Sequence, residues 1–225
     1  MEDKFTKGCY DLDQEPYTFI HWPKIDTFIY FSHHFITIPP IGWIEAGHKN
    51  GVSILGTIIT EVDAGAKIWK TIFSSSENTK LLIQKCVQIC QHVGFDGWLL
   101  NIENVIDKEN IEDLKQFVQE LTGAMHEMNP DSKVLWYDSV TVDGKLEWQN
   151  ALNDLNSPFF ELCDGIFLNY TWTEETLGNS VLYCPGNDVL LINLVNLSIL
   201  EIKMNKDLLD KCERGNKIAP LWHKC

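Results

Sequence analysis

Apolar positions along the chain follow two alternating patterns. Five short segments are rich in β-branched and aromatic residues, which is typical of buried β-strands. These predicted strands are residues 25–31, 52–60, 97–103, 133–140 and 165–170. Between them lie segments with apolar residues three and four positions apart, the spacing of an amphipathic helix. The predicted helices are residues 41–50, 79–93, 110–128 and 147–155.

The order strand, helix, strand, helix is typical of a parallel β-sheet covered by helices. The chain is therefore expected to be α/β, and two architectures fit: an open doubly wound sheet and a (β/α) barrel. The sequence lacks the loops Gly-x-Gly-x-x-Gly and Gly-x-x-x-x-Gly-Lys, which disfavours the nucleotide-binding sheets. In a barrel the active site lies at the C-terminal ends of the strands.

A pair of polar residues closes the third predicted strand. Side chains alternate along a strand, so Asn101 and Glu103 are expected on one face and Ile102 on the other. Partial burial at a barrel mouth favours the protonated form of a carboxyl group, which suits Glu103 as a general acid. The Asn101 amide offers both a donor and an acceptor for a substrate amide. The pair therefore predicts cleavage beside a 2-acetamido sugar whose own carbonyl oxygen attacks the anomeric carbon, unlike two-carboxylate hydrolysis.

Aromatic residues gather at or just after the last predicted strands. They are Trp136, Tyr137, Trp148, Tyr170 and Trp172. Sugar sites combine apolar rings with a few polar groups, so this cluster supports a carbohydrate substrate. The adjacent His33 and His34 have no third ligand at helical or strand spacing, so neither a metal site nor a cofactor is predicted.

Charge and composition narrow the range of partners. The 225 residues include 18 Lys and Arg against 32 Asp and Glu, a formal net charge of −14. Phosphate backbones and anionic membrane surfaces repel such a chain, so neither nucleic acid nor a membrane is an expected partner. Residues 1–10 lack the apolar segment of a signal peptide, and the apolar run 189–202 is shorter than a membrane span of about 20 residues. With no Cys-x-x-Cys among the seven cysteines, these features favour a reducing cytosol.

Five ordered motifs resemble glycoside hydrolase family 85, the cytosolic endo-β-N-acetylglucosaminidases. They are YFSHHFITIPPIGW (30–43), GFDGWLLNIEN (94–104), VLWYDSV (134–140), LEWQNALND (146–154) and CDGIFLNYTWTEE (163–175). The resemblance implies hydrolysis of the bond between the two N-acetylglucosamines of the N-glycan core, in glycoproteins or free oligosaccharides. It also implies retention of configuration through an oxazoline-type intermediate.

The resemblance also assigns roles to matching positions. It implies that Asn101 orients the acetamido group, that Glu103 is the general acid and base, and that Tyr137 lies near the reacting sugar. It further implies three glycan-binding residues, namely Trp148, Asn169 and Trp172.

The chain also departs from this resemblance, which implies a full (β/α)8 barrel of typically about 250 residues. Only five strands match, so we expect an incomplete TIM-type barrel: one catalytic domain over 1–225, with a family-like core over 17–175 and a divergent segment over 176–225. In that segment, residues 189–195 are an expected strand and 205–214 an expected helix. The alternative to an active enzyme is a truncated, impaired variant that at most binds glycans. A chitinase-like enzyme is a weaker alternative, because position 101 carries no acidic residue.

Overall fold

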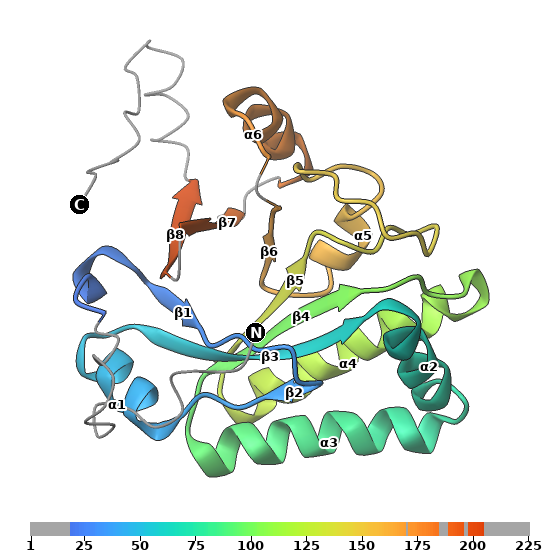
Figure 1. Cartoon of the computed structure of the whole chain (residues 1–225), viewed down its shortest axis with the longest axis horizontal. Helices are drawn as coiled ribbons and strands as arrows, with labels where there is room; N and C mark the ends of the chain where they lie inside the picture. The colour runs from blue at the N-terminus through green and yellow to red at the C-terminus, as the bar shows by residue number, and fades with distance from the viewer. Residues whose placement is uncertain (1–18, 170, 185–188, 196–197, 205–225) are drawn as a thin grey trace, which may run out of the picture.

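The computed structural model describes residues 19–169, 171–184, 189–195 and 198–204. Its centre is one curved sheet whose strands follow the order β1-β3-β4-β5-β6-β7-β8, with the short strand β2 paired to β3 (Figure 1). The strands are β1 (Thr27–Ile29), β2 (Ile36–Thr37), β3 (Ser53–Glu61), β4 (Gly97–Glu103), β5 (Lys133–Tyr137), β6 (Gly165–Phe167), β7 (Val189–Val195) and β8 (Ser198–Met204).

The strand order distinguishes a barrel from an open doubly wound sheet. From β1 through β3 to β7 every pairing is parallel, and strands that follow one another in the chain are neighbours in the sheet. A doubly wound sheet would reverse its strand order at a switch point, and this sheet has no such reversal among the described strands. The antiparallel strand β8 ends the sheet and approaches β1, but no ladder of hydrogen bonds joins these two described strands. The fold is therefore an incomplete barrel, as expected from the sequence.

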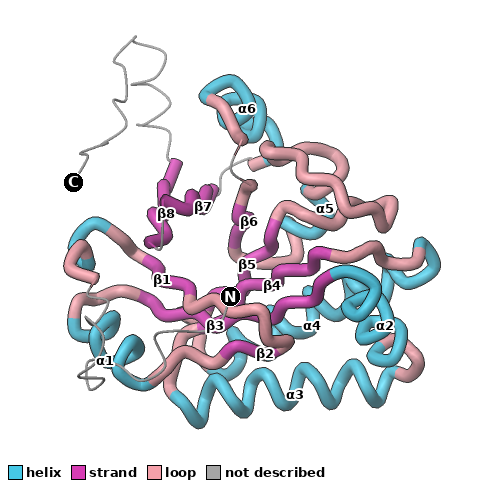
Figure 2. Tube along the Cα trace, viewed as in Figure 1, coloured by secondary structure: helices cyan, strands magenta, loops and turns pink. Residues whose placement is uncertain are grey.

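Six helices accompany the strands in the described part of the chain. They are α1 (Ile41–Lys49), α2 (Val62–Ile72), α3 (Ser76–Val93), α4 (Ile111–Met128), α5 (Ser157–Phe160) and α6 (Glu174–Ser180). Helices α2, α3 and α4 lie along the convex side of the sheet (Figure 2). The predicted apolar face of α4 is buried there, including Leu114, Phe117 and Leu121. None of the described helices has the length and apolarity needed to cross a lipid bilayer.

Side chains on the two faces of the sheet pack into two separate clusters. On the convex face, residues such as Ile54, Trp98 and Trp136 pack against the helices. On the concave face a second cluster fills the barrel interior, made of Ile29, Leu55, Leu99, Leu135, Tyr137 and Phe167. Because side chains alternate along a strand, this division decides which residues at each strand end face the barrel mouth.

Two aspartates fasten the N-terminal ends of strands on the opposite side from that mouth. Asp96 accepts hydrogen bonds of 2.7 Å from the backbone N–H of Ile54 and from the His48 imidazole of α1. Asp164 repeats this arrangement with the N–H of Val134, at 2.7 Å, and with His126 of α4. In each case the aspartate precedes a strand-starting glycine, so the repeated Asp-Gly sequence ties one strand and one helix to the next strand.

Several sequence-based predictions need correction. Residues 147–155 do not form a helix; they belong to a loop organised by hydrogen bonds to Asp138, described below. Helix α2 and strands β2 and β8 were not expected, whereas the predicted strand over 189–195 is confirmed as β7. The predicted helix 205–214 lies outside the described residues. The single domain over 1–225 and its division at residue 175 stay predictions.

Candidate active site

Asn101 and Glu103 lie side by side at the mouth-facing end of β4. Both point to the concave side, and the Asn101 Nδ2 donates a hydrogen bond of 3.1 Å to the Glu103 carboxylate. Asn101 is 3% exposed, while Glu103 is half-buried. The Ser139 hydroxyl holds the end of this strand by donating to the Ile102 carbonyl at 2.8 Å. The strand thus presents a buried amide and a partly exposed carboxylate in contact with each other.

Tyr137 and Asn169 form a second polar pair on the neighbouring strands. Tyr137 ends β5, and its hydroxyl donates to the Asn169 Oδ1 at 3.2 Å, just after β6. The tyrosine ring is 6% exposed and packs edge-on against Phe167, with ring centroids 5.6 Å apart. Both side chains face the same concave side as Asn101. The structure therefore brings four of the six predicted site residues to adjacent strand ends.

Asp138 organises the loop that carries Trp148. This side chain is 1% exposed and accepts hydrogen bonds from the backbone N–H groups of Gln149, at 3.0 Å, and Asn150, at 2.6 Å. The Asn156 amide donates to it at 2.9 Å. Burial raises the pKa of the Asp138 carboxyl above its ordinary value of 3.8, and these hydrogen bonds act in the opposite direction. A buried acceptor therefore fixes the chain directly after Trp148.

At about pH 4, replacing Asp138 by asparagine is expected to lower the free energy of unfolding by about 2 kcal/mol, because its Nδ2 would face N–H donors. In the wild type the raised pKa keeps Asp138 protonated to higher pH in the folded state than in the unfolded state. The contribution of Asp138 to the free energy of unfolding is therefore fully present below about pH 4. It is lost as the pH rises through the raised pKa. The difference in free energy of unfolding between the wild type and Asp138→Asn should therefore become smaller as the pH rises.

Urea unfolding of both proteins at several pH values measures this difference. The exposed Asp143 lies in the same loop, and Asp143→Asn should change stability by less than about 0.5 kcal/mol. A difference between wild type and Asp138→Asn that is the same at every pH would contradict the prediction.

The two predicted tryptophans lie on loops rather than on strands. Trp148 follows β5 and is 43% exposed, whereas Trp172 follows β6 and packs partly against the outer core. The Asn150 side chain connects these loops by accepting a hydrogen bond of 3.3 Å from the Thr171 N–H. Trp136 has a structural role only: it is fully buried on the convex face and stacks on Phe159 at 4.3 Å. Tyr170 lies outside the described residues.

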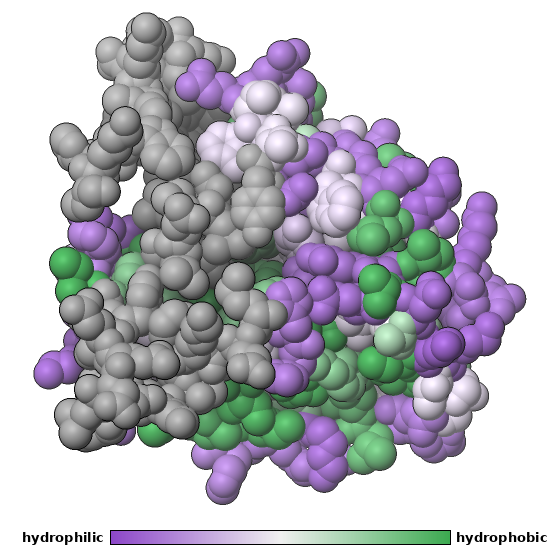
Figure 3. All heavy atoms as spheres, viewed as in Figure 1, coloured by the Kyte–Doolittle hydropathy of each residue, from purple (hydrophilic) through white to green (hydrophobic). Residues whose placement is uncertain are grey.

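Apolar side chains are exposed just after several strand ends. Phe31 follows β1, Val62 follows β3 and Val105 follows β4, with exposed fractions of 44%, 72% and 58%. Together with Trp148 they lie in the segments that surround the mouth. In Figure 3 hydrophobic residues form several small groups among hydrophilic ones on the visible face. Such a mixture of apolar and polar groups is compatible with a sugar-binding surface.

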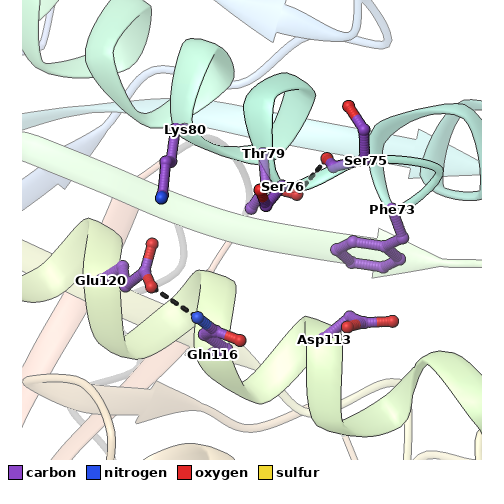
Figure 4. A pocket seen from close by; sticks show the side chains of 8 residues that line it. All are labelled: Phe73, Ser75, Ser76, Thr79, Lys80, Asp113, Gln116 and Glu120. Atoms are coloured by element: carbon purple, nitrogen blue, oxygen red, sulfur yellow. Dashed lines mark hydrogen bonds between the residues drawn. The ribbon is translucent and has the colours of Figure 1, made fainter.

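A small cavity between α3 and α4 lies away from these residues. Phe73, Thr79 and Lys80 line one side, and Asp113, Gln116 and Glu120 line the other (Figure 4). All of these residues come from the helical layer or the turn before α3, so the cavity belongs to the outside of the barrel. It contains no predicted site residue.

One further pair of residues at the barrel mouth, His33 and Glu61, received no role from the sequence. The His33 Nδ1 lies 3.0 Å from the Glu61 carboxylate, and Glu61 ends β3 next to Glu103. Both residues were recognisable as strand-end residues, but they are 28 positions apart, and only the fold brings them together. Within the described parts of the chain, no three His, Cys, Asp or Glu side chains gather in a way that could hold a metal ion.

Two related proteins align in sequence with most of this chain. The cytosolic endo-beta-N-acetylglucosaminidase of Danio rerio is 48% identical over 177 residues, which cover 79% of this chain and 24% of the relative. Cytosolic endo-beta-N-acetylglucosaminidase 2 of Arabidopsis thaliana is 45% identical over 175 residues, or 78% of this chain and 25% of the relative. The chain thus spans about a quarter of the length of these relatives.

Comparison of structures and of family profiles agrees with these sequence matches. The glycoside hydrolase domain of Endo-D from Streptococcus pneumoniae R6 superposes with a TM-score of 0.67 at 22% identity, over 76% of this chain and 28% of that one. This likeness confirms the barrel-type fold. The profile of glycosyl hydrolase family 85 matches residues 2–191, which is most of the chain. The chain therefore belongs to glycosyl hydrolase family 85.

Proposed function

We propose that this chain carries the catalytic centre of an endo-β-N-acetylglucosaminidase, which hydrolyses the bond between the two N-acetylglucosamines of the N-glycan core. The observation that carries the proposal is the contact between Asn101 and Glu103 at the mouth-facing end of β4. Family membership and the names of the relatives support the same reaction. The substrates are N-linked glycans of glycoproteins or the corresponding free oligosaccharides, encountered in the cytosol.

In the first step the substrate supplies the nucleophile. Its acetamido carbonyl oxygen attacks the anomeric carbon while the bond from that carbon to the leaving oxygen breaks. Glu103, as the carboxylic acid, donates its proton to the leaving oxygen. The Oδ1 of Asn101 accepts a hydrogen bond from the acetamido N–H and so holds the carbonyl oxygen in line for attack. The product of this step is an oxazoline-type ring on the glycan.

In the second step a water molecule opens this ring. Glu103, now a carboxylate, takes a proton from the water as its oxygen bonds to the anomeric carbon, and the acetamido group is restored. Two inversions at the same carbon give net retention of configuration. The Nδ2 of Asn101 stays close enough to hydrogen-bond the Glu103 carboxylate, which supports the carboxylate between the two steps.

The remaining predicted residues surround this centre. Tyr137, which donates to Asn169, forms the wall of the mouth on the β5 and β6 side and lies near the reacting sugar. Trp148 presents a large exposed aromatic side chain for stacking on a sugar ring, and Asp138 keeps its loop in place. Trp172 contributes to the same side through the loop after β6.

Mass spectrometry of a defined N-glycopeptide incubated with the purified chain tests the proposal. We expect release of the glycan and a peptide that keeps one N-acetylglucosamine. Proton NMR of the released glycan should show the β-anomer first, as retention requires. An intact glycopeptide after incubation with a chain that circular dichroism shows to be folded would overturn the proposal, and initial release of the α-anomer would overturn the mechanism.

A further inference from the structure

We infer that His33 and Glu61 form a second sugar-binding pair, which binds hydroxyl groups of the sugar unit next to the one that reacts at Glu103. This inference rests on the proposed function, because it concerns the same substrate and the same barrel mouth. It extends that site from β4, β5 and β6 to the neighbouring strand β3 and the loop after β1.

The pairing of strands places Glu61 beside the catalytic carboxylate. Strands β3 and β4 are parallel, with Ile59 opposite Asn101 and Glu61 opposite Glu103. Partners in a parallel pair point to the same face, and neighbouring strands are about 4.8 Å apart. Glu61 therefore faces the mouth one strand away from Glu103, within the span of a disaccharide.

The loop that carries His33 is held in one conformation by its own hydrogen bonds. The Ser32 and Thr37 hydroxyls are 2.6 Å apart, and the Thr37 hydroxyl donates to the His34 carbonyl at 3.1 Å. The Ile59 N–H donates to the Phe35 carbonyl at 2.9 Å, which joins this loop to β3. His33 is thus presented to Glu61 by a fixed support rather than by a free chain.

Stability alone does not account for this contact between His33 and Glu61. The His33 and Glu61 side chains are 51% and 33% exposed, and ion pairs that accessible to water contribute little to folding. The residue after Glu61, Val62, has a φ of 48°, which is strained for a β-branched side chain. Such strain is found mainly where it serves a site, and here it directly follows the Glu61 carboxylate.

The chemistry of the pair suits a pyranose. A carboxylate can accept hydrogen bonds from two adjacent hydroxyl groups, and an imidazole whose Nδ1 is engaged by the carboxylate leaves its Nε2 for another partner. The exposed Phe31 ring lies edge-on to His33, with centroids 5.3 Å apart, and adds an apolar surface. Polar acceptors beside an aromatic ring are the usual composition of a sugar subsite.

Steady-state cleavage of the N-glycopeptide by Glu61→Gln and His33→Ala tests the pair. We expect KM to rise about tenfold in each variant, because a hydrogen bond to a charged group is lost, while kcat stays within about threefold. His48→Ala is the matched control, since it removes an imidazole from a carboxylate at the opposite end of the strands. Its KM should equal that of the wild type. Unchanged KM in both mouth variants would overturn the inference.

A direct measurement of glycan binding distinguishes a failure of this inference from a failure of the proposed function. In the Glu103→Gln background, trimannosyl-chitobiose, the core oligosaccharide of N-glycans, is titrated while the His33 imidazole C–H resonance is followed by NMR. We expect that resonance to shift on binding, and Glu61→Gln to weaken binding about tenfold. If the wild type cleaves nothing but these binding effects are seen, the pair stands and the proposed reaction fails. If the folded chain binds without a His33 shift, or does not bind, the pair fails whatever the cleavage assay shows.

Discussion

Replacing Glu103 by glutamine is expected to lower kcat/KM for the N-glycopeptide by about a thousandfold, since general acid–base catalysis contributes about 10²–10⁴. Glutamine keeps the shape of the side chain and an acceptor for the Asn101 amide, so the local structure and substrate binding should persist. It cannot protonate the leaving oxygen in the first step or accept a proton from water in the second. The loss should therefore appear in kcat, with little change in KM.

Two comparisons make this result specific to proton transfer. A substrate with para-nitrophenolate as its leaving group needs less protonation, so Glu103→Gln should lose less activity towards it than towards the natural glycan. Glu112→Gln, on α4, replaces a side chain that is 83% exposed and should leave activity unchanged. Equal losses on both substrates, or a wild-type rate for Glu103→Gln, would remove Glu103 from its proposed role.

The features of this site that the sequence predicted are those encoded by local periodicity. The continuous apolar run before Asn101 identifies β4 as a strand buried on both faces, and alternation then places Asn101 and Glu103 on one side. The sequence grouped Trp136 with Tyr137, and the structure corrects this grouping, because neighbours in a strand face opposite layers and Trp136 faces the convex one. Each of these predictions needs only a few consecutive residues.

The predictions that failed depend on contacts between distant residues. The segment 147–155 has helical spacing, but Asn150 has a φ of 53°, outside the helical region, while Asp138 holds its N–H group and that of Gln149. Helix α2 was missed because its Gly65 weakens the helical signal. In the fold that glycine is required, since a Cβ there would fall 2.8 Å from the Thr60 Cβ and against the Asn104 side chain.

A second large effect is expected at the other end of β4, the strand that carries Asn101 and Glu103. Gly97 starts β4, and a Cβ at this position would fall on the Lys133 carbonyl oxygen, with the Lys133 backbone C and N at 2.7 and 2.8 Å. These are backbone atoms of β5, so no side-chain rotation can make room. Gly97→Ala should therefore lower the free energy of unfolding by more than about 4 kcal/mol, a large part of a typical total of about 5–15 kcal/mol.

Gly123→Ala is a control, because this glycine substitution is expected to raise the free energy of unfolding rather than lower it. Gly123 lies within α4 with no atom near its would-be Cβ, so alanine there should raise stability by about 0.5–1 kcal/mol through its higher helix propensity. Urea unfolding and amide hydrogen exchange of β4 measure both variants. Because Gly97 lies on the strand that carries Asn101 and Glu103, any folded Gly97→Ala protein should also lose glycan cleavage, whereas Gly123→Ala should keep it. A Gly97→Ala protein as stable as the wild type would mean that β4 and β5 are not packed as closely as this register requires.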